Sequence, residues 1–244
     1  MALKEEFEKS GNWLFQRRST LPLLILPLLI LALKNSEHTQ KTFSGSAEVL
    51  WQSFSIFLSC LGFFVRCFTV GWVTEGTSGR NTKGQLAEKL NTDGMYSIVR
   101  HPLYLGNFLI LFGVALFIQV FWFAGIFALC FWLYYERIMF AEEEFLRRKF
   151  QEAYSSWDQK TPAFIPNFKE WRCPKKAFSI RMVLRREYGT LLGLVVSFIL
   201  LEFLDEFFSK NQLRFLSFWW ILLGFAFGSY FFLRHLRKKT KWLS

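Results

Sequence analysis

The chain lacks the cysteine pattern of a metal site or a disulfide framework. It contains only four cysteines, none of which forms a CxxC pair or stands at ligand spacing to a histidine. Three of them, Cys60, Cys67 and Cys130, lie inside apolar runs, which predicts packing residues. No metal ion and no disulfide framework are therefore expected.

Charged residues are also scarce, at 20% of the chain, whereas hydrophobic residues reach 52% and aromatic residues 20%. This composition excludes an ordinary soluble domain of 244 residues. The apolar residues form runs, which predicts an all-α polytopic membrane protein. The formal net charge is +11, and basic residues crowd the ends of the runs. We therefore expect anionic lipid head groups as partners, and no nucleic acid.

The predicted transmembrane helices come from five apolar runs: Leu21–Leu33, Val49–Val73, Leu103–Tyr135, Tyr188–Leu204 and Phe215–Leu233. The third run would reach about 50 Å as a single helix, too long for a hydrocarbon core of roughly 30 Å. Two short or tilted helices joined near Gln119 satisfy this limit better. The first run could be a signal-peptide core, but no small-residue cleavage site follows it. About six spans, including a short hairpin, are therefore predicted.

Loop charges test this count independently. The loops Lys34–Glu48 and Asp205–Arg214 each carry two basic and two acidic residues. The opposite side would hold twelve Lys or Arg between Arg137 and Arg186, and five more in the tail Arg234–Lys241. Six spans with both termini cytoplasmic obey the positive-inside rule throughout. Arg66, inside the second span, is expected to snorkel toward the cytoplasmic end of its helix.

Two polar clusters bracket the predicted hairpin. The first runs from Arg100 to Asn107, and its Pro102 suits the first turn of a helix. The second contains Glu136-Arg137 and Glu142-Glu143-Glu144. Because the two arms of a hairpin return to the same membrane face, the clusters are predicted to meet there.

The segments around these clusters have turn and breaker chemistry. Asn91-Thr92-Asp93-Gly94 favours a turn in which Gly94 can take a positive φ. Pro162 and Pro166 are expected to end the helix after the second cluster and to lay an extended apolar segment on the membrane surface.

Each polar residue has a structural interpretation when it is taken alone. Arg100 could anchor a helix at the membrane edge, and the glutamates could be solvated partners of Arg147 and Arg148. Asn107, however, lies one turn into the membrane and needs a partner, and a carboxylate at the bilayer edge is costly unless it is paired or functional. The conjunction of the two clusters favours a functional site.

Three motifs follow one another in the order Leu90–Tyr96, Arg100–Gly106 and Glu142–Tyr154, closing with Pro162 and Ile165-Pro166. In this order they resemble the isoprenylcysteine carboxyl methyltransferase family, to which the phospholipid methyltransferases look related. The resemblance covers about Arg80 to Phe168. It implies a membrane enzyme that holds S-adenosylmethionine in a pocket at the cytosolic face. No GxGxxG occurs, so a Rossmann-type methyltransferase is not implied.

The resemblance also implies residue roles. Its cofactor contacts fall on Leu90, Asn91, Tyr96, His101, Pro102, Leu103, Tyr104, and Glu142 or Glu143. Arg137 lies near the arginine that the family places beside the methyl acceptor. Arg100 could also clamp an anion, so these two arginines are the predicted catalytic residues. Where many relatives have glycine, this chain has Gln151.

The methyl acceptor is predicted to be an anionic lipid group. The basic charge and a similarity to bacterial family members favour a lipid phosphate, of the lipid A 1-phosphate kind, in a bacterial inner membrane. Carboxyl methylation of isoprenylcysteine or of another small lipophilic acceptor is the alternative within the enzyme class. A non-enzymatic lipid-binding membrane scaffold is the alternative outside it.

The chain is predicted to have three consecutive parts. Residues 1–75 form a two-span membrane segment, residues 76–170 form the methyltransferase core, and residues 171–244 form a basic linker with two further spans.

Overall fold

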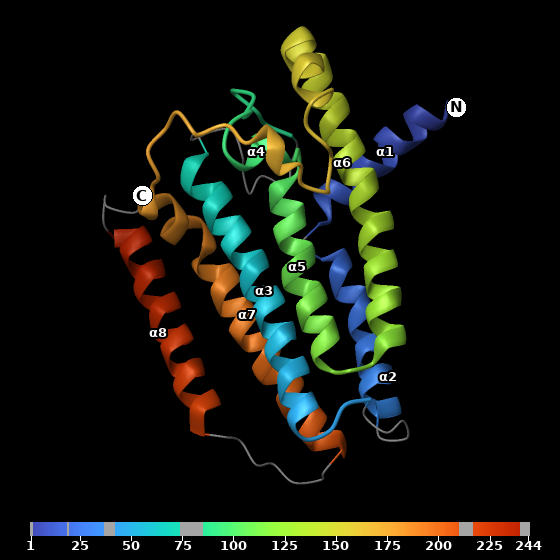
Figure 1. Cartoon of the computed structure of the whole chain (residues 1–244), viewed down its shortest axis with the longest axis vertical. Coiled ribbons are helices and arrows are strands. Elements are labelled where there is room, and N and C mark those ends of the chain that lie inside the picture. The colour runs from blue at the N-terminus through green and yellow to red at the C-terminus, as the bar shows by residue number, and fades with distance from the viewer. Residues whose placement is uncertain (1, 19, 37–41, 74–84, 210–216, 240–244) are drawn as a thin grey trace. The chain divides into compact units, whose positions relative to one another are not determined.

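A computed structural model describes residues 2–18, 20–36, 42–73, 85–209 and 217–239. Every regular element in these ranges is a helix, which confirms the prediction of an all-α chain (Figure 1). The α-helices are α1 (Leu3–Gln16), α2 (Leu26–Ser36), α3 (Ser46–Trp72), α4 (Met95–Ile98), α5 (Pro102–Phe117), α6 (Phe121–Asp158), α7 (Ile180–Ser209) and α8 (Ser217–Lys239). Two 3-10 helices, η1 (Leu21–Ile25) and η2 (Phe168–Glu170), complete the described elements. Residues 76–84 of the predicted methyltransferase core lie outside the described ranges.

Two of the described helices, α3 and α6, are long and apolar enough to cross a membrane. The pair Leu3–Gln16 and Leu21–Lys34, bent by 87°, adds a third candidate if the pair counts as one span. Helix α5 is apolar but has only 16 residues. These helices support a membrane protein, while the count of six spans, the topology and the three-part division stay predictions.

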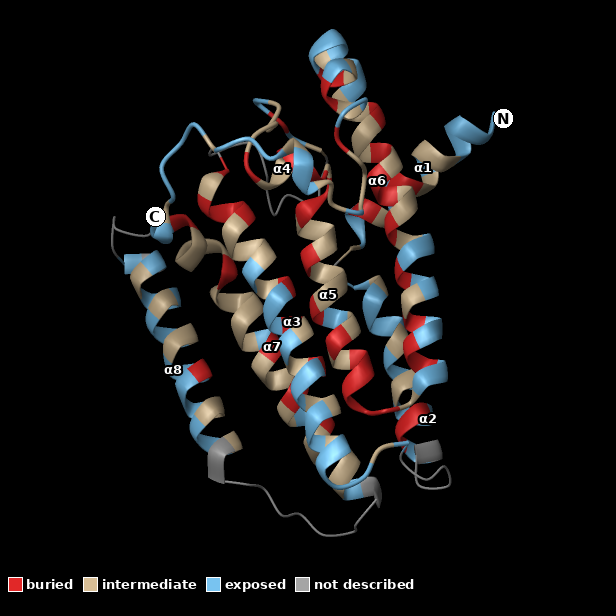
Figure 2. Cartoon of the chain, viewed as in Figure 1, coloured by how far each residue is buried: buried red, intermediate tan, exposed pale blue. Residues whose placement is uncertain are grey.

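Large apolar side chains are exposed along several helices, in keeping with contact to lipid (Figure 2). Phe57 and Phe64 on α3 and Phe231 on α8 are examples. Cys60 and Cys130 are exposed as well, so the expectation that they pack inside the protein was wrong for these two residues.

The predicted hairpin break is present. Helix α5 ends at Phe117 and α6 begins at Phe121. Between them Gln119 has a φ of 59°, which an α-helix cannot contain. The buried Gln119 side chain accepts a hydrogen bond of 3.0 Å from the backbone N–H of Phe43. One continuous helix over this run is therefore excluded.

Helix α6 continues from its apolar half into a polar half that begins near Glu136. No glycine or proline lies between Ile126 and Asp158, so neither residue type ends the helix in this stretch, although its backbone is kinked at Gln151. The helix ends at Asp158, shortly before Pro162, as the proline predicted.

The backbone of α6 is kinked and strained at Gln151, which separates the helical residues 121–150 from the helical residues 152–158. The φ of Gln151 is 44° and its ψ is −114°, a conformation that side chains with a Cβ rarely adopt. Such a residue costs on the order of 1–3 kcal/mol, whereas glycine adopts positive φ readily. The strain falls on the position where the resembled family often has glycine.

The described contacts divide the chain into two compact units. The loop unit comprises Met1–Ile25, Trp72–Leu105 and Ala128–Phe178, and the bundle unit comprises Leu26–Gly71, Gly106–Phe127 and Ser179–Ser244. Within the bundle unit, α7 packs against both α8 and α2.

A buried ion pair ties together three helices of the bundle unit. Arg66 on α3 donates from Nε and Nη2 to the two carboxylate oxygens of Glu187 on α7, at 2.9 and 2.8 Å. Its Nη1 donates to Oδ1 of Asn107 on α5. The side chain of Glu187 is 3% exposed and that of Arg66 is 15% exposed. The expectation that Arg66 snorkels was therefore wrong, because it finds its partners inside the bundle.

Close approach of α3 and α5 places Arg66 beside Asn107. A Cβ at Gly62 would lie 2.6 Å from the carbonyl oxygen of Gly106, and a Cβ at Gly106 would lie 2.6 Å from Cγ of Arg66. Small residues at such an interface let helix backbones approach closely, which is common in membrane proteins.

Replacing Gln151 with glycine should stabilise the protein. We expect Gln151→Gly to relieve about 1 kcal/mol of strain and to raise the melting temperature in detergent by about 2–4 °C. Glu152→Gly is the matched control, because a glycine at an ordinary helical position should lower the melting temperature. Equal shifts in both variants would contradict the strain at Gln151.

Removing one partner of the buried ion pair should destabilise the bundle strongly. Glu187→Ala leaves the Arg66 guanidinium buried and uncompensated, at a cost of about 3–5 kcal/mol or roughly 10 °C in melting temperature. The double variant Arg66→Met with Glu187→Leu should recover most of this loss, because it removes both charges. The idea fails if thermal unfolding shows the double variant to be no more stable than Glu187→Ala.

Candidate functional site

The start of α5 is positioned by a turn at Gly94. Gly94 has a φ of 62°, as its sequence context predicted, and its carbonyl accepts a hydrogen bond of 2.7 Å from the Ser97 hydroxyl. After the single turn of α4, the chain extends to His101. The carbonyl of His101 accepts hydrogen bonds from the N–H groups of Tyr104 and Leu105, so His101 caps the helix. Pro102 is then the first residue of α5, as predicted.

The segment after α6 is held against this loop by backbone hydrogen bonds. The N–H of Arg100 donates to the carbonyl of Pro162 at 2.8 Å, and the N–H of His101 donates to that of Ala163 at 3.2 Å. Further along, the N–H of Asn167 donates to the carbonyl of Ile98 at 2.8 Å. The two stretches therefore fix each other, and His101 does not depend on α5 alone for its position.

His101 lies between two carboxylates of α6. Its Nε2 is 2.9 Å from Oε1 of Glu143, and its Nδ1 is 3.6 Å from Oε2 of Glu142. The Tyr104 hydroxyl donates to Oε1 of Glu142 at 2.7 Å. His101 is buried, and each glutamate side chain is partly exposed. The structure thus brings His101 and Tyr104 of the first predicted cluster against Glu142 and Glu143 of the second.

Arg100 lies on the other side of Glu143. Its Nε is 3.2 Å from Glu143 Oε1, and its Nη1 is 3.9 Å from Asp158 Oδ2. Arg147 contacts Asp158 as well, at 3.3 Å. Arg100 is therefore engaged by carboxylates of its own chain.

Aromatic rings form the apolar side of the cluster. The ring centroids of Tyr104 and Tyr135 are 4.8 Å apart, and those of Tyr135 and Phe131 are 4.2 Å apart. Tyr154 is fully buried, and its hydroxyl has no hydrogen-bond partner within the described parts of the chain. An unpaired buried hydroxyl costs about 1–3 kcal/mol, so a polar ligand that reached it would be stabilised.

Arg137 does not join this cluster. Its guanidinium stacks 3.7 Å above the ring of Phe7 on α1, and its Nη1 contacts Oγ of Ser10 at 3.4 Å. At about 100° per residue, the five positions from Arg137 to Glu142 turn the helix by about 140° beyond a full turn. Arg137 and Glu142 therefore lie on nearly opposite faces of α6.

Glu144 shares the face of Arg137 and is not part of the cluster either. It is buried, with Lys4 of α1 at 2.8 Å and an ion pair to Arg147. Of the three consecutive glutamates, only Glu142 and Glu143 face His101.

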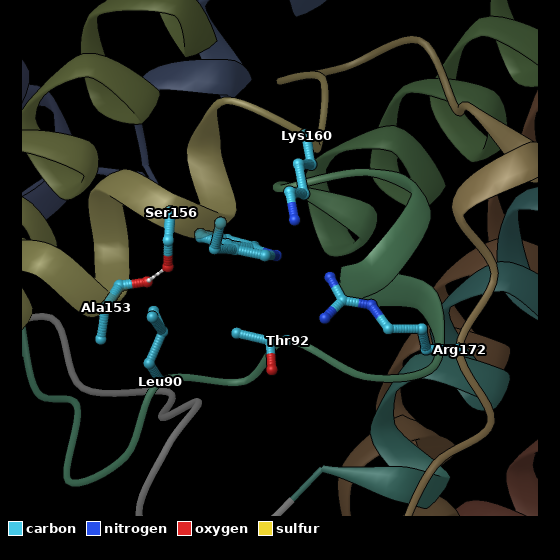
Figure 3. A pocket seen from close by; sticks show the side chains of 7 residues that line it. Leu90, Thr92, Ala153, Ser156, Lys160 and Arg172 are labelled. Atoms are coloured by element: carbon cyan, nitrogen blue, oxygen red, sulfur yellow. Dashed lines mark hydrogen bonds between the residues drawn. The ribbon is translucent and has the colours of Figure 1, made fainter.

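A pocket of about 390 Å³ lies at the end of α6, within the same unit (Figure 3). Its lining residues come from the loop before α4, from α6 and the turn after it, and from the segment beyond η2: Leu90, Thr92, Ala153, Ser156, Trp157, Lys160 and Arg172. The side chains of Lys160 and Arg172 point into it (Figure 3). Among the predicted cofactor contacts, Leu90 lines this pocket.

Several pocket residues were missed in the sequence, although a signal was present. Ala153, Ser156, Trp157 and Lys160 recur at the i, i+3, i+4 and i+7 spacing of one helix face. Trp157 also fixes the loop, because its indole N–H donates to the carbonyl of Tyr96 at 2.8 Å. Asn91, Tyr96 and Leu103 are partly buried residues of the same unit, and their cofactor roles stay predictions.

Comparison with known proteins gives one family. Residues 50–153 match the family described as phospholipid methyltransferase. This stretch contains α3 almost entirely, α5 and most of α6, and therefore also His101, Tyr104, Glu142 and Glu143. No solved structure gives a significant match.

Three curated relatives cover similar shares of the chain. A nickel-cobalt-cadmium resistance protein of Alcaligenes xylosoxydans xylosoxydans is 36% identical, over 43% of this chain and 52% of that protein. A cobalt-zinc-cadmium resistance protein of Cupriavidus metallidurans is 34% identical, over 43% of this chain and 46% of that protein. A protein-S-isoprenylcysteine O-methyltransferase of Schizosaccharomyces pombe is 29% identical, over 48% of this chain and 50% of that protein.

The chain thus spans about half the length of the curated relatives it matches. The match of residues 50–153 to the phospholipid methyltransferase family, together with the isoprenylcysteine O-methyltransferase relative, agrees with the resemblance of the motifs.

Proposed function

We propose that this chain is an integral membrane methyltransferase that uses S-adenosylmethionine and acts on an anionic lipid group. The observation that carries the proposal is the contact of His101 with both Glu142 and Glu143, inside the segment that matches the family. A first choice of acceptor is a lipid phosphate, supported by the net charge of +11 and by the exposed apolar helix surfaces.

The residues of the cluster fit this cofactor. Carboxylates such as Glu142 and Glu143 can accept hydrogen bonds from ribose hydroxyls or from an ammonium group. The rings of Tyr104 and Tyr135 offer faces for an adenine or a sulfonium. The Tyr154 hydroxyl lacks a partner in the described structure, which a polar ligand would supply. S-adenosylmethionine, when bound, supplies the activated methyl group.

The main contribution of the protein to this reaction is to position the methyl donor and the acceptor. Methyl transfer from a sulfonium is an in-line displacement, so alignment of donor and acceptor provides much of the rate. A phosphate or carboxylate acceptor is already anionic near neutral pH and needs no general base. His101, held between two carboxylates, therefore serves to orient Glu142 and Glu143 rather than to abstract a proton.

The contacts of Arg100 and Arg137 give little support to the prediction that these two residues bind the acceptor anion. Arg100 faces Glu143 and Asp158, and Arg137 is held by α1. An acceptor anion would have to displace these contacts before either guanidinium could clamp it.

Carboxyl methylation of a prenylated cysteine is the second candidate function. It is favoured by the Schizosaccharomyces pombe relative, which is named for that activity. Both candidate functions use the same cofactor and an anionic acceptor. They differ in whether that acceptor is a phosphate or a carboxylate.

Loss of the contact between His101 and the carboxylates should weaken cofactor binding. We expect Glu142→Ala and His101→Ala each to weaken the affinity for S-adenosylmethionine about tenfold or more, because charge-assisted hydrogen bonds are lost. Isothermal calorimetry on the purified chain measures this directly. Glu152→Gln, an exposed change on the same helix, is the control and should bind like the native chain. A native chain without measurable affinity would instead support a non-enzymatic scaffold.

The acceptor should be a phosphate lipid. With a labelled methyl donor, we expect label to enter lipids with a terminal phosphate monoester, and not the matching neutral lipids. A prenylcysteine analogue, tested in parallel, separates the two candidates. Labelling of the prenylcysteine analogue alone would contradict the lipid-phosphate assignment and would leave the methyltransferase assignment standing.

A further inference from the structure

Lys160 and Arg172 both direct their cationic side chains into one pocket. Their side chains converge on it from different segments (Figure 3). Within the described residues, neither side chain makes a hydrogen bond or an ion pair. Arg100 and Arg148, by contrast, are engaged by carboxylates. We propose that this pocket binds the anionic head group of a membrane lipid, and that this lipid is the methyl acceptor.

The pocket is built on fixed backbone. The N–H of Arg172 donates to Oγ of Ser97 at 2.9 Å, and the carbonyl of Arg172 accepts from the N–H of Gly94 at 2.9 Å. The Trp157 indole is tied to the carbonyl of Tyr96 at 2.8 Å. The backbone of Arg172 and the side chain of Trp157 are therefore held in place, which lowers the entropy lost when an anion binds.

The pocket adjoins the His101 cluster through two short links. Lys160 is followed by Thr161, whose hydroxyl donates to the carbonyl of Ser97 at 3.3 Å. The next residue, Pro162, accepts the hydrogen bond from the N–H of Arg100. Only one or two residues thus separate the basic pocket from the residues that position the predicted cofactor site.

Exposed apolar residues favour a lipid as the source of the anion. Ile165 is 80% exposed and Phe168 is 74% exposed, and both lie between Lys160 and Arg172 in the chain. Such side chains are unfavourable in water and suit the membrane interface. A pocket of about 390 Å³ lies at the small end of the range for small-molecule sites, which suits a head group without its acyl chains.

Opposite charges would keep the two ligands apart. The methyl donor carries a sulfonium, which the carboxylates of Glu142 and Glu143 favour, whereas an anion favours Lys160 and Arg172. This inference rests on the proposed function for the identity of the lipid as acceptor, and on the pocket alone for the binding of an anionic head group.

The test measures binding and methyl transfer separately in the full-length chain. Lys160→Gln and Arg172→Gln should each weaken the affinity for short-chain phosphatidic acid in micelles by about tenfold, because each removes a charge-assisted hydrogen bond. The double variant should raise the KM for this lipid and leave the affinity for S-adenosylmethionine unchanged. Lys169→Gln is the matched control, because it removes a charge from the same segment but does not line the pocket.

Three results would overturn the pocket assignment. These are native lipid affinity or KM in the double variant, an equal loss in Lys169→Gln, and binding of inorganic phosphate as tight as that of the lipid. The pocket assignment is supported if the variants lose phosphatidic acid binding and the native chain does not bind diacylglycerol. If the native chain binds phosphatidic acid through this pocket but transfers no methyl group to it, the pocket stands as a lipid site and the assignment of a lipid phosphate as methyl acceptor fails.

Discussion

Polar groups placed among apolar side chains must find partners within the chain, and each unit of this structure is organised by one such pairing. In the bundle unit, Arg66 and Glu187 form a bidentate ion pair with Asn107 as a third member. In the loop unit, His101 is held between Glu142 and Glu143. An isolated charge in either place would carry a large desolvation penalty, so each pairing fixes which helix faces can meet.

The bundle pairing reaches beyond the part of the chain that matches the family. Arg66 and Asn107 belong to residues 50–153, whereas Glu187 lies on α7, outside that stretch. Glu187 supplies the counter-charge that makes Arg66 tolerable in an apolar helix. Glycines at the contact of α3 and α5 then let a long guanidinium side chain lie between the backbones.

Features that follow from local sequence were predictable, and features that depend on distant partners were not. The hairpin break near Gln119 followed from the length of one apolar run, and the conformations of Gly94 and Pro102 followed from their own chemistry. The pairing of Arg66 joins residues 121 positions apart, which no local pattern reveals. Gln151 was visible only as a departure from a family glycine, and its strain needed coordinates.

In the candidate site, too, local features were predictable and contacts with distant residues were not. These contacts decide which cationic side chains are available to bind an anionic acceptor. A hairpin argument brought His101 to the glutamates, but it could not say which face of α6 meets α1. Helix α1 takes that face: it stacks Phe7 on Arg137 and pairs Lys4 with Glu144. Arg137, the arginine predicted to bind the acceptor, and the neighbouring Glu144 therefore both have partners on α1. An anionic acceptor of the proposed kind would therefore meet positive charge at the end of α6, where Lys160 lines the pocket with Arg172 and neither side chain is paired by a described residue.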